Sequence, residues 1–149
     1  MKRTVALVLA LAIAGVVATT GSASTTTRSG DLHVTKECPP SEYQGNAGDF
    51  CTITSSNIPA IKPGMRVVYA SAADFGAGTL DSDLVLDGPG HNNAFGHVEL
   101  NLATFTGVVT FSGGTGRFSH FHAGPLAVAC PAFPACSWDG TYGFSPPAE

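Results

Sequence analysis

The sequence predicts an all-β domain, a sandwich or barrel of about seven or eight strands, behind an N-terminal signal peptide. Only 12% of the 149 residues are charged, and Thr, Ser, Asn and Gly take the place of the missing charges. A charged fraction of about a quarter is usual. From Asp49 onward, short β-prone runs alternate with Gly- and Pro-rich turns. After the N-terminal segment, no window repeats apolar residues at helical spacing over three turns.

Residues 1–24 have the features of a secretory signal peptide. Lys2 and Arg3 form a positive start, Val5–Ala18 is an uncharged apolar run, and small residues follow. This run is about 14 residues long, shorter than the roughly 20 that a membrane-spanning helix needs. We therefore expect cleavage at the end of this segment and a secreted protein, extracellular or periplasmic.

The net charge excludes several kinds of partner. Loss of Lys2 and Arg3 with the signal peptide leaves five basic and eleven acidic residues, a net charge of −6. Anionic membranes and nucleic acids repel a chain of this sign. We therefore expect no nucleic-acid partner, and no membrane contact after signal cleavage.

Four cysteines remain after cleavage, namely Cys38, Cys51, Cys130 and Cys136. An even number in an exported chain predicts two disulfides, although four cysteines allow three connectivities. We favour the local pairs Cys38–Cys51 and Cys130–Cys136, because each pair brackets a Pro- or Gly-rich segment that gains from a covalent link. Zinc would need tighter Cys-x-x-Cys spacing, so we expect no metal.

The expected strands are defined by aromatic and β-branched residues and by the turns between them. Residues 25–48 are interpreted as a polar lead-in with the first disulfide loop, and residues 49–149 as the barrel domain. In chain order, the first four candidates are Phe50–Ser55, Met65–Ala70, Ser82–Leu86 and Phe95–Leu102. These end at turns starting at Asn57, Asp74, Asp87 and Ala103. The remaining candidates are Phe105–Phe111, a weak Arg117–Ala123, Leu126–Cys130 and Trp138–Phe144, separated by Ser112–Gly116, Gly124-Pro125 and the second Cys-Pro loop.

Several of these runs are apolar on both faces. In Phe95–Leu102, one face holds Val98, Leu100 and Leu102, and the other holds Phe95 together with polar residues. Such strands suit a barrel that packs its interior and contacts a neighbour outside. A mixed sandwich would give a similar pattern.

The segment Phe111-Ser-Gly-Gly-Thr-Gly-Arg-Phe118 follows a predicted strand, and its glycines indicate a sharp bend. It lacks the Gly-Lys-Ser/Thr ending of a phosphate-binding loop. The segment resembles the Gly-Gly-Thr-Gly-x-Phe signature of the allene oxide cyclase and dirigent barrel superfamily. The likeness extends to Gly107 and to the closing strand Trp138–Phe144, and so covers residues 49–144.

This resemblance implies an eight-stranded antiparallel barrel with an apolar cavity. The family barrels are often trimeric or dimeric, so the resemblance is compatible with a homo-oligomer but leaves the oligomeric state open. Members of the superfamily steer or catalyse the cyclisation and coupling of hydrophobic small molecules. Dirigent-type members continue the signature with Ala-Arg-Gly, where this chain has Phe121-His122-Ala123. No catalytic residue is therefore carried over.

Four polar residues are candidates for contacts with a ligand. His97 and Glu99 share a strand face and form the best acid–base pair. Tyr69 could place a phenol inside an apolar barrel, and His122 would share a face with His120. A metal site built from these histidines and Glu99 would depart from the cupin spacing, so we interpret them as polar pairs rather than metal ligands.

Two functions are compatible with these features. The first is binding, or cyclisation, of a small hydrophobic molecule in the barrel interior without a cofactor. Whether the chain is an enzyme stays open. If it is one, the absence of a nucleophile motif favours a cyclase-, isomerase- or dirigent-like activity without a covalent nucleophile. The alternative is a non-catalytic extracellular interaction module that uses the barrel exterior. The volume of the interior distinguishes the two functions.

Overall fold

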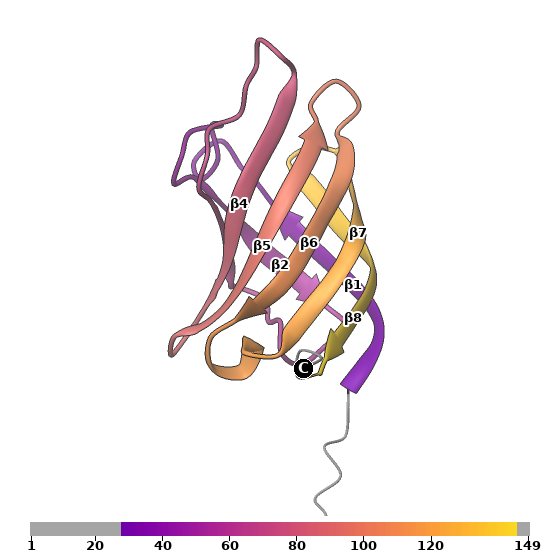
Figure 1. Cartoon of the computed structure of the whole chain (residues 1–149). Helices are drawn as coiled ribbons and strands as arrows, with labels where there is room; N and C mark the ends of the chain where they lie inside the picture. The colour runs from indigo at the N-terminus through magenta and orange to yellow at the C-terminus, as the bar shows by residue number, and fades with distance from the viewer. Residues whose placement is uncertain (1–27, 146–149) are drawn as a thin grey trace, which may run out of the picture.

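In the computed structural model, which describes residues 28–145, eight antiparallel strands follow one another around a closed barrel (Figure 1). β1 closes the barrel by pairing with β8. The strands are β1 (Arg28–Glu37), β2 (Phe50–Ser56), β3 (Arg66–Tyr69), β4 (Thr79–Gly88), β5 (Asn92–Asn101), β6 (Thr106–Gly114), β7 (Phe121–Ala132) and β8 (Ala135–Phe144). The predicted all-β antiparallel barrel is confirmed. The expected signal peptide, residues 1–24, lies outside the described residues.

The barrel begins earlier than the sequence predicts. β1 occupies Arg28–Glu37, inside the segment interpreted as a lead-in, and pairs with β8 from Arg28↔Phe144 to Glu37↔Ala135. Its inward face is built from Leu32, Val34 and Lys36, which are buried. Closure of the barrel supplies backbone partners along the whole strand, and such distant pairing overrides the weak local propensity of this polar run.

β7 joins two runs that the sequence predicts as separate strands. It continues from Phe121 to Ala132 through Gly124-Pro125, with an irregular register against β8 between Ala123 and Ala127. Arg117 and Phe118, predicted as the start of a strand, instead belong to η1 (Gly116–Phe118), a single 3-10 turn. Within residues 28–145, no helix is long and apolar enough to cross a membrane.

The Gly-rich segment forms the end of β6 and the bend that follows it. Gly114 packs so closely on the backbone of Asn93 and Ala94 that an added Cβ would overlap both. Gly116 has a positive φ of 56° and lies against the Asn92 side chain. The predicted connection over residues 112–116 is therefore shorter than expected, because residues 112–114 still belong to β6.

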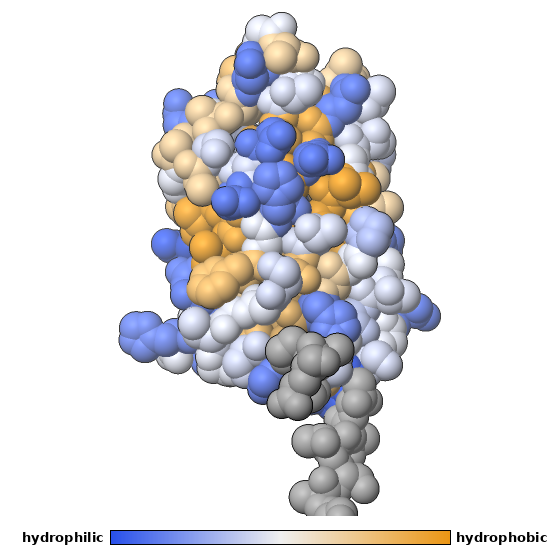
Figure 2. Space-filling view, viewed as in Figure 1, coloured by the Kyte–Doolittle hydropathy of each residue, from blue (hydrophilic) through white to orange (hydrophobic). Residues whose placement is uncertain are grey.

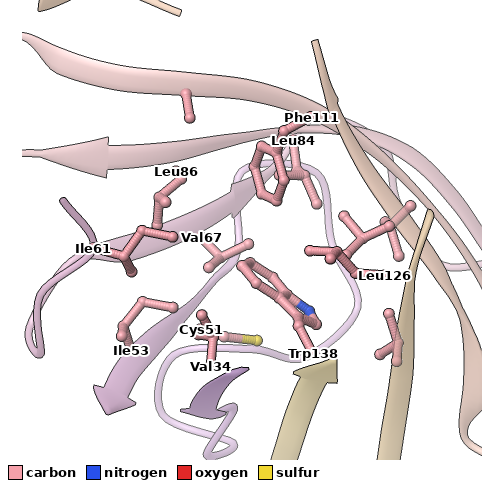
Figure 3. Close-up of a cluster of buried hydrophobic side chains, with 14 of the residues drawn as sticks. Val34, Cys51, Ile53, Ile61, Val67, Leu84, Leu86, Phe111, Leu126 and Trp138 are labelled. Atoms are coloured by element: carbon pink, nitrogen blue, oxygen red, sulfur yellow. The ribbon is translucent and has the colours of Figure 1, made fainter. Parts of the chain in front are cut away.

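One part of the barrel interior is filled by an aromatic and aliphatic core. The Trp138 indole lies near Cys51, Val67 and Leu126 and points toward Phe111 (Figure 3). Phe111 contacts Trp138 and Phe121 at centroid distances of 5.5 and 5.6 Å. Farther along, Phe118 and Phe144 pack on Phe121 beside η1. These rings close the η1 end of the barrel.

Candidate functional site

The opposite end of the barrel contains a cavity of about 290 Å³. Its walls come from strand positions that face inward, and its rim from the β5–β6 and β7–β8 turns, at the top of Figure 1. The lining is mostly apolar. It consists of Lys36, Cys38, Tyr43, Gln44, Cys51, Tyr69, Ala73, Phe75, Leu80, Val98, Leu100, Leu102, Phe105, Val128, Cys130, Phe133 and Cys136.

Both predicted disulfides, Cys38–Cys51 and Cys130–Cys136, are present and line the cavity. The first ties the segment after β1 to β2, and the second spans the β7–β8 turn. The Cys38 amide also donates a hydrogen bond of 3.0 Å to the Pro134 carbonyl, which joins the two disulfide-bonded segments. The disulfides indicate an oxidising compartment, in agreement with the expected export.

The segment between β1 and β2 covers one side of the cavity. Its Tyr43 packs edge-on against Tyr69, with 5.2 Å between ring centroids. The Ala73 amide donates to the Gly45 carbonyl at 2.9 Å, which joins this segment to the one between β3 and β4. The β1–β2 and β3–β4 segments together therefore form one wall of the cavity.

Exposed aromatic rings surround the mouth of the cavity. Phe75 is 70% exposed and Phe133 is 45% exposed, although both line the cavity. Phe133 packs on Phe105 at a centroid distance of 5.4 Å. Phe105 has a positive φ of 53°, a backbone conformation that non-glycine residues rarely adopt. Such strained positions are often found at functional sites.

Lys36 is the one cationic side chain among the described residues that line this cavity. It is only 5% exposed, and its Nζ donates a hydrogen bond to the Tyr69 hydroxyl. The same Nζ lies 5.1 Å from the ring centroids of both Tyr69 and Trp138. Lys36 therefore sits between the cavity and the packed core, with aromatic faces as its main stabilising neighbours.

Burial shifts the acid–base properties of both members of this pair. Desolvation lowers the pKa of Lys36 to about 7. Desolvation, followed by the charge effect of Tyr43, raises the pKa of Tyr69 above its usual value. Near neutral pH the amine is therefore protonated in only about half of the molecules, while the phenol keeps its proton.

The Tyr69 hydroxyl has a second neighbour, Cys51 Sγ, at 3.6 Å. Because this sulfur belongs to a disulfide, it can only accept from the hydroxyl. The Tyr69 hydroxyl therefore lies between an acceptor sulfur and Lys36 Nζ.

The structure places the four sequence-predicted candidates in different surroundings. Tyr69 is buried and lines the cavity. His97 and Glu99 lie on the outward side of β5, and His122 is exposed on β7. A ligand inside the barrel would not contact these three, because each alternates with buried neighbours that face inward. The expectation that they orient an interior ligand is therefore corrected, and only an outer-surface role remains for them.

His97 belongs to a polar cluster on the outer face of β4–β6, where hydrophilic and hydrophobic groups mix (Figure 2). Its Nδ1 lies 2.8 Å from Asp83 Oδ1 and its Nε2 lies 3.1 Å from Asp81 Oδ1. The hydrogen bond with Asp83 is the main cause that raises the pKa of His97. Asp81, His97 and Glu99 also bring possible metal-ligand atoms within 4.8 Å of one another. Both ring nitrogens of His97 already contact carboxylates. Ion pairs between a protonated His97 and the two aspartates therefore explain this arrangement without a metal ion.

Lys36 is not among the site residues predicted from the sequence, although one sequence pattern indicates it. Leu32, Val34 and Lys36 alternate with polar residues and share the inward face of β1. The pattern is meaningful only if this segment is a strand, whereas the sequence predicts residues 25–48 to be a lead-in without one. Once β1 is recognised, a lysine in register with two buried hydrophobic residues indicates a buried amine.

Comparison with models of known protein families, with curated protein sequences and with solved structures finds no match for this chain.

Proposed function

We propose that this protein binds a small hydrophobic molecule in the cavity of its barrel. The observation that carries the proposal is the shape of the interior. The buried rings of Trp138, Phe118 and Phe121 fill the interior toward the η1 end, whereas the other end keeps a cavity of about 290 Å³ with a mostly apolar lining. Ligand pockets have volumes of about 300–1,000 Å³, so this cavity suits a small ligand.

The lining explains both the affinity and the orientation of such a ligand. Burial of its apolar surface contributes about 25 cal/mol per Å² removed from water. Lys36 and Tyr69 are the polar groups at the inner end of the cavity, and they would bind the polar end of the molecule. The exposed rings of Phe75 and Phe133 would contact it at the mouth.

The proposal includes a distant relationship to the allene oxide cyclase and dirigent barrels. The closed eight-stranded antiparallel barrel and the close packing of Gly114 at the end of β6 and of Gly116 in the following bend support it. It also includes secretion of the mature protein, which the two disulfides support. Cyclisation of the ligand would depend on its shape and on exclusion of water, because the cavity holds no thiol or carboxylate among its described lining residues.

A thermal-shift screen of fatty-acid-derived and polyketide-like compounds tests the binding function. Val98 lines the cavity, and Val108 is exposed on the neighbouring strand β6. We expect Val98→Trp to fill the cavity and abolish the ligand-induced rise in melting temperature. The matched Val108→Trp variant adds the same ring outside the barrel and should keep that rise.

Circular dichroism of each variant without ligand confirms that it folds, and Val98→Phe replaces Val98→Trp if the larger ring prevents folding. No stabilisation by any compound, or equal stabilisation of both variants, would show that the interior is only a core. The interaction module that uses the barrel exterior would then be the better explanation, and the exposed Phe95 and Val108 would be the first positions to examine.

A further inference from the structure

The amine of Lys36 is held in surroundings that are unusual for a lysine. Its strand neighbours in register are Ile53 on β2 and Cys136 on β8, and its Nζ lies between the Tyr69 and Trp138 rings. Among the described residues that line the cavity, the titratable side chains are Lys36, Tyr43 and Tyr69. The nearby carboxylates of Glu37 and Asp139 are exposed on the outer face.

A buried lysine is usually paired with a carboxylate that stabilises its charge. Lys36 instead contacts a neutral hydroxyl and aromatic faces. These surroundings favour the neutral amine, which has a lone pair and is a nucleophile. The burial that lowers the pKa of Lys36 to about 7 makes this form abundant at neutral pH.

We propose that Lys36 is a covalent carbonyl-binding site, whose ε-amine forms an imine with the aldehyde of a small hydrophobic molecule held in the cavity. This inference rests on the proposed binding function and specifies its ligand class. The aldehyde would lie at the inner end of the cavity beside Nζ, and the hydrophobic part would extend toward the mouth. The apolar lining would also exclude the water that hydrolyses imines.

The reaction balances without any other reactant. The Nζ lone pair attacks the carbonyl carbon, so that a C–N bond forms and the oxygen becomes the hydroxyl of a carbinolamine. The C–O bond then breaks, the oxygen leaves as water, and a C=N bond replaces it. Both hydrogens of the neutral amine leave in that water. No oxidation or reduction takes place.

Tyr69 is placed to move the protons in this reaction. Its hydroxyl is hydrogen-bonded to Nζ, and its raised pKa keeps it protonated at neutral pH. It can donate a proton to the departing oxygen and recover one from the nitrogen. Phenylalanine at this position would keep the ring and remove the proton donor.

The chain itself supplies a control lysine. Lys36 and Lys62 are the lysines beyond the predicted signal peptide, and Lys62 is exposed in the turn before β3. Exported protein from the full-length sequence is incubated with octanal and sodium cyanoborohydride, which reduces an imine to a stable secondary amine. Peptide mapping then gives the labelling rate at Lys36, at Lys62 and at the N-terminal amine.

We expect octanal to label Lys36 about tenfold or more faster than Lys62 near pH 7, because the Lys36 amine lies beside the cavity that holds the aldehyde and its pKa is lowered to about 7. The rate at Lys36 should level off above about pH 7, once its amine is neutral. Lys36→Met should lose the fast label and Lys62→Met should keep it. Tyr69→Phe should slow the labelling at Lys36 while octanol still binds.

Glycolaldehyde, a hydrophilic aldehyde, should show no preference for Lys36. Equal rates at the two lysines, or a rate at Lys36 that keeps rising well above pH 7, would overturn the imine proposal. Octanol, which has no carbonyl group, separates the two proposals in a thermal-shift assay. If octanol stabilises the protein but octanal does not label Lys36, the imine proposal fails and the binding function stands. If octanol has no effect and Lys36 is not labelled, both fail.

Discussion

Burial of Lys36 makes the stability of the whole barrel depend on pH. In the unfolded chain its pKa is near the usual 10.5, and in the folded protein it is about 7. Between these values the unfolded state binds more protons than the folded state. The free energy of unfolding therefore rises with pH across this window and is lowest below about pH 7.

Replacement of Lys36 by methionine tests this effect, because methionine keeps the length and flexibility of the side chain without its charge. We expect Lys36→Met to be more stable than the wild type at about pH 6, by about 1–4 kcal/mol. The difference should shrink by up to about 1.4 kcal/mol for each pH unit between about 7 and 10. Urea unfolding of both proteins at several pH values measures it. A constant difference, or a less stable variant at low pH, would contradict the assigned burial.

At the scale of one element, the end of β6 depends on close backbone packing. Gly114 has an extended conformation rather than a positive φ, so the requirement for glycine there is one of space. An added Cβ would overlap the Asn93 carbonyl oxygen. Gly30 on β1 is a suitable comparison, because a Cβ at that position would meet the Tyr142 ring at an ordinary 3.5 Å.

We therefore expect Gly114→Ala to lower the melting temperature clearly, and Gly30→Ala to change it little. A larger side chain, as in Gly114→Val or Gly116→Val, should impair folding further. Overpacking that shifts the backbone typically lowers the free energy of unfolding by about 1–3 kcal/mol, and we expect a loss of this size at the β5–β6 contact. Thermal unfolding followed by circular dichroism gives the comparison. If Gly114→Ala is as stable as Gly30→Ala, the close approach of β5 and β6 at this point is wrong.

The two disulfides act at the scale of the whole molecule, and both lie at the cavity end of the barrel. Phe118, Phe121 and Phe144 pack together at the other end, whereas the Trp138 indole lies near Cys51. A disulfide that closes a loop of about 15 residues contributes about 3 kcal/mol, and the shorter Cys130–Cys136 loop should contribute less.

We therefore expect reduction of both disulfides to lower the melting temperature while the far-ultraviolet spectrum stays that of a β protein. The ligand-induced stabilisation should fall at the same time, because both disulfides hold cavity walls. Single pairs of Cys→Ser substitutions would show which wall matters more. Complete loss of β structure on reduction would mean that the core at the η1 end cannot maintain the barrel alone.

The sequence by itself determined that the fold is all-β, placed most strands and favoured the two disulfide pairs that the structure contains. These features depend on local patterns such as the alternation in Phe95–Leu102, the turn chemistry after Asp87 and the Pro-rich loops between cysteines. Local patterns also placed Tyr69 on a strand, and the structure shows that its side chain is buried.

Only the tertiary structure decided that Arg28–Glu37 is a strand and that Lys36 lies beside Tyr69. The two residues belong to strands that are not neighbours in the barrel, and β1 gains its hydrogen-bond partners from β8, far along the chain. The same closure decided which strand faces point inward, and it left His97, Glu99 and His122 on the outside. A strand pattern shows two faces but not which one the barrel encloses, because that depends on how all eight strands meet.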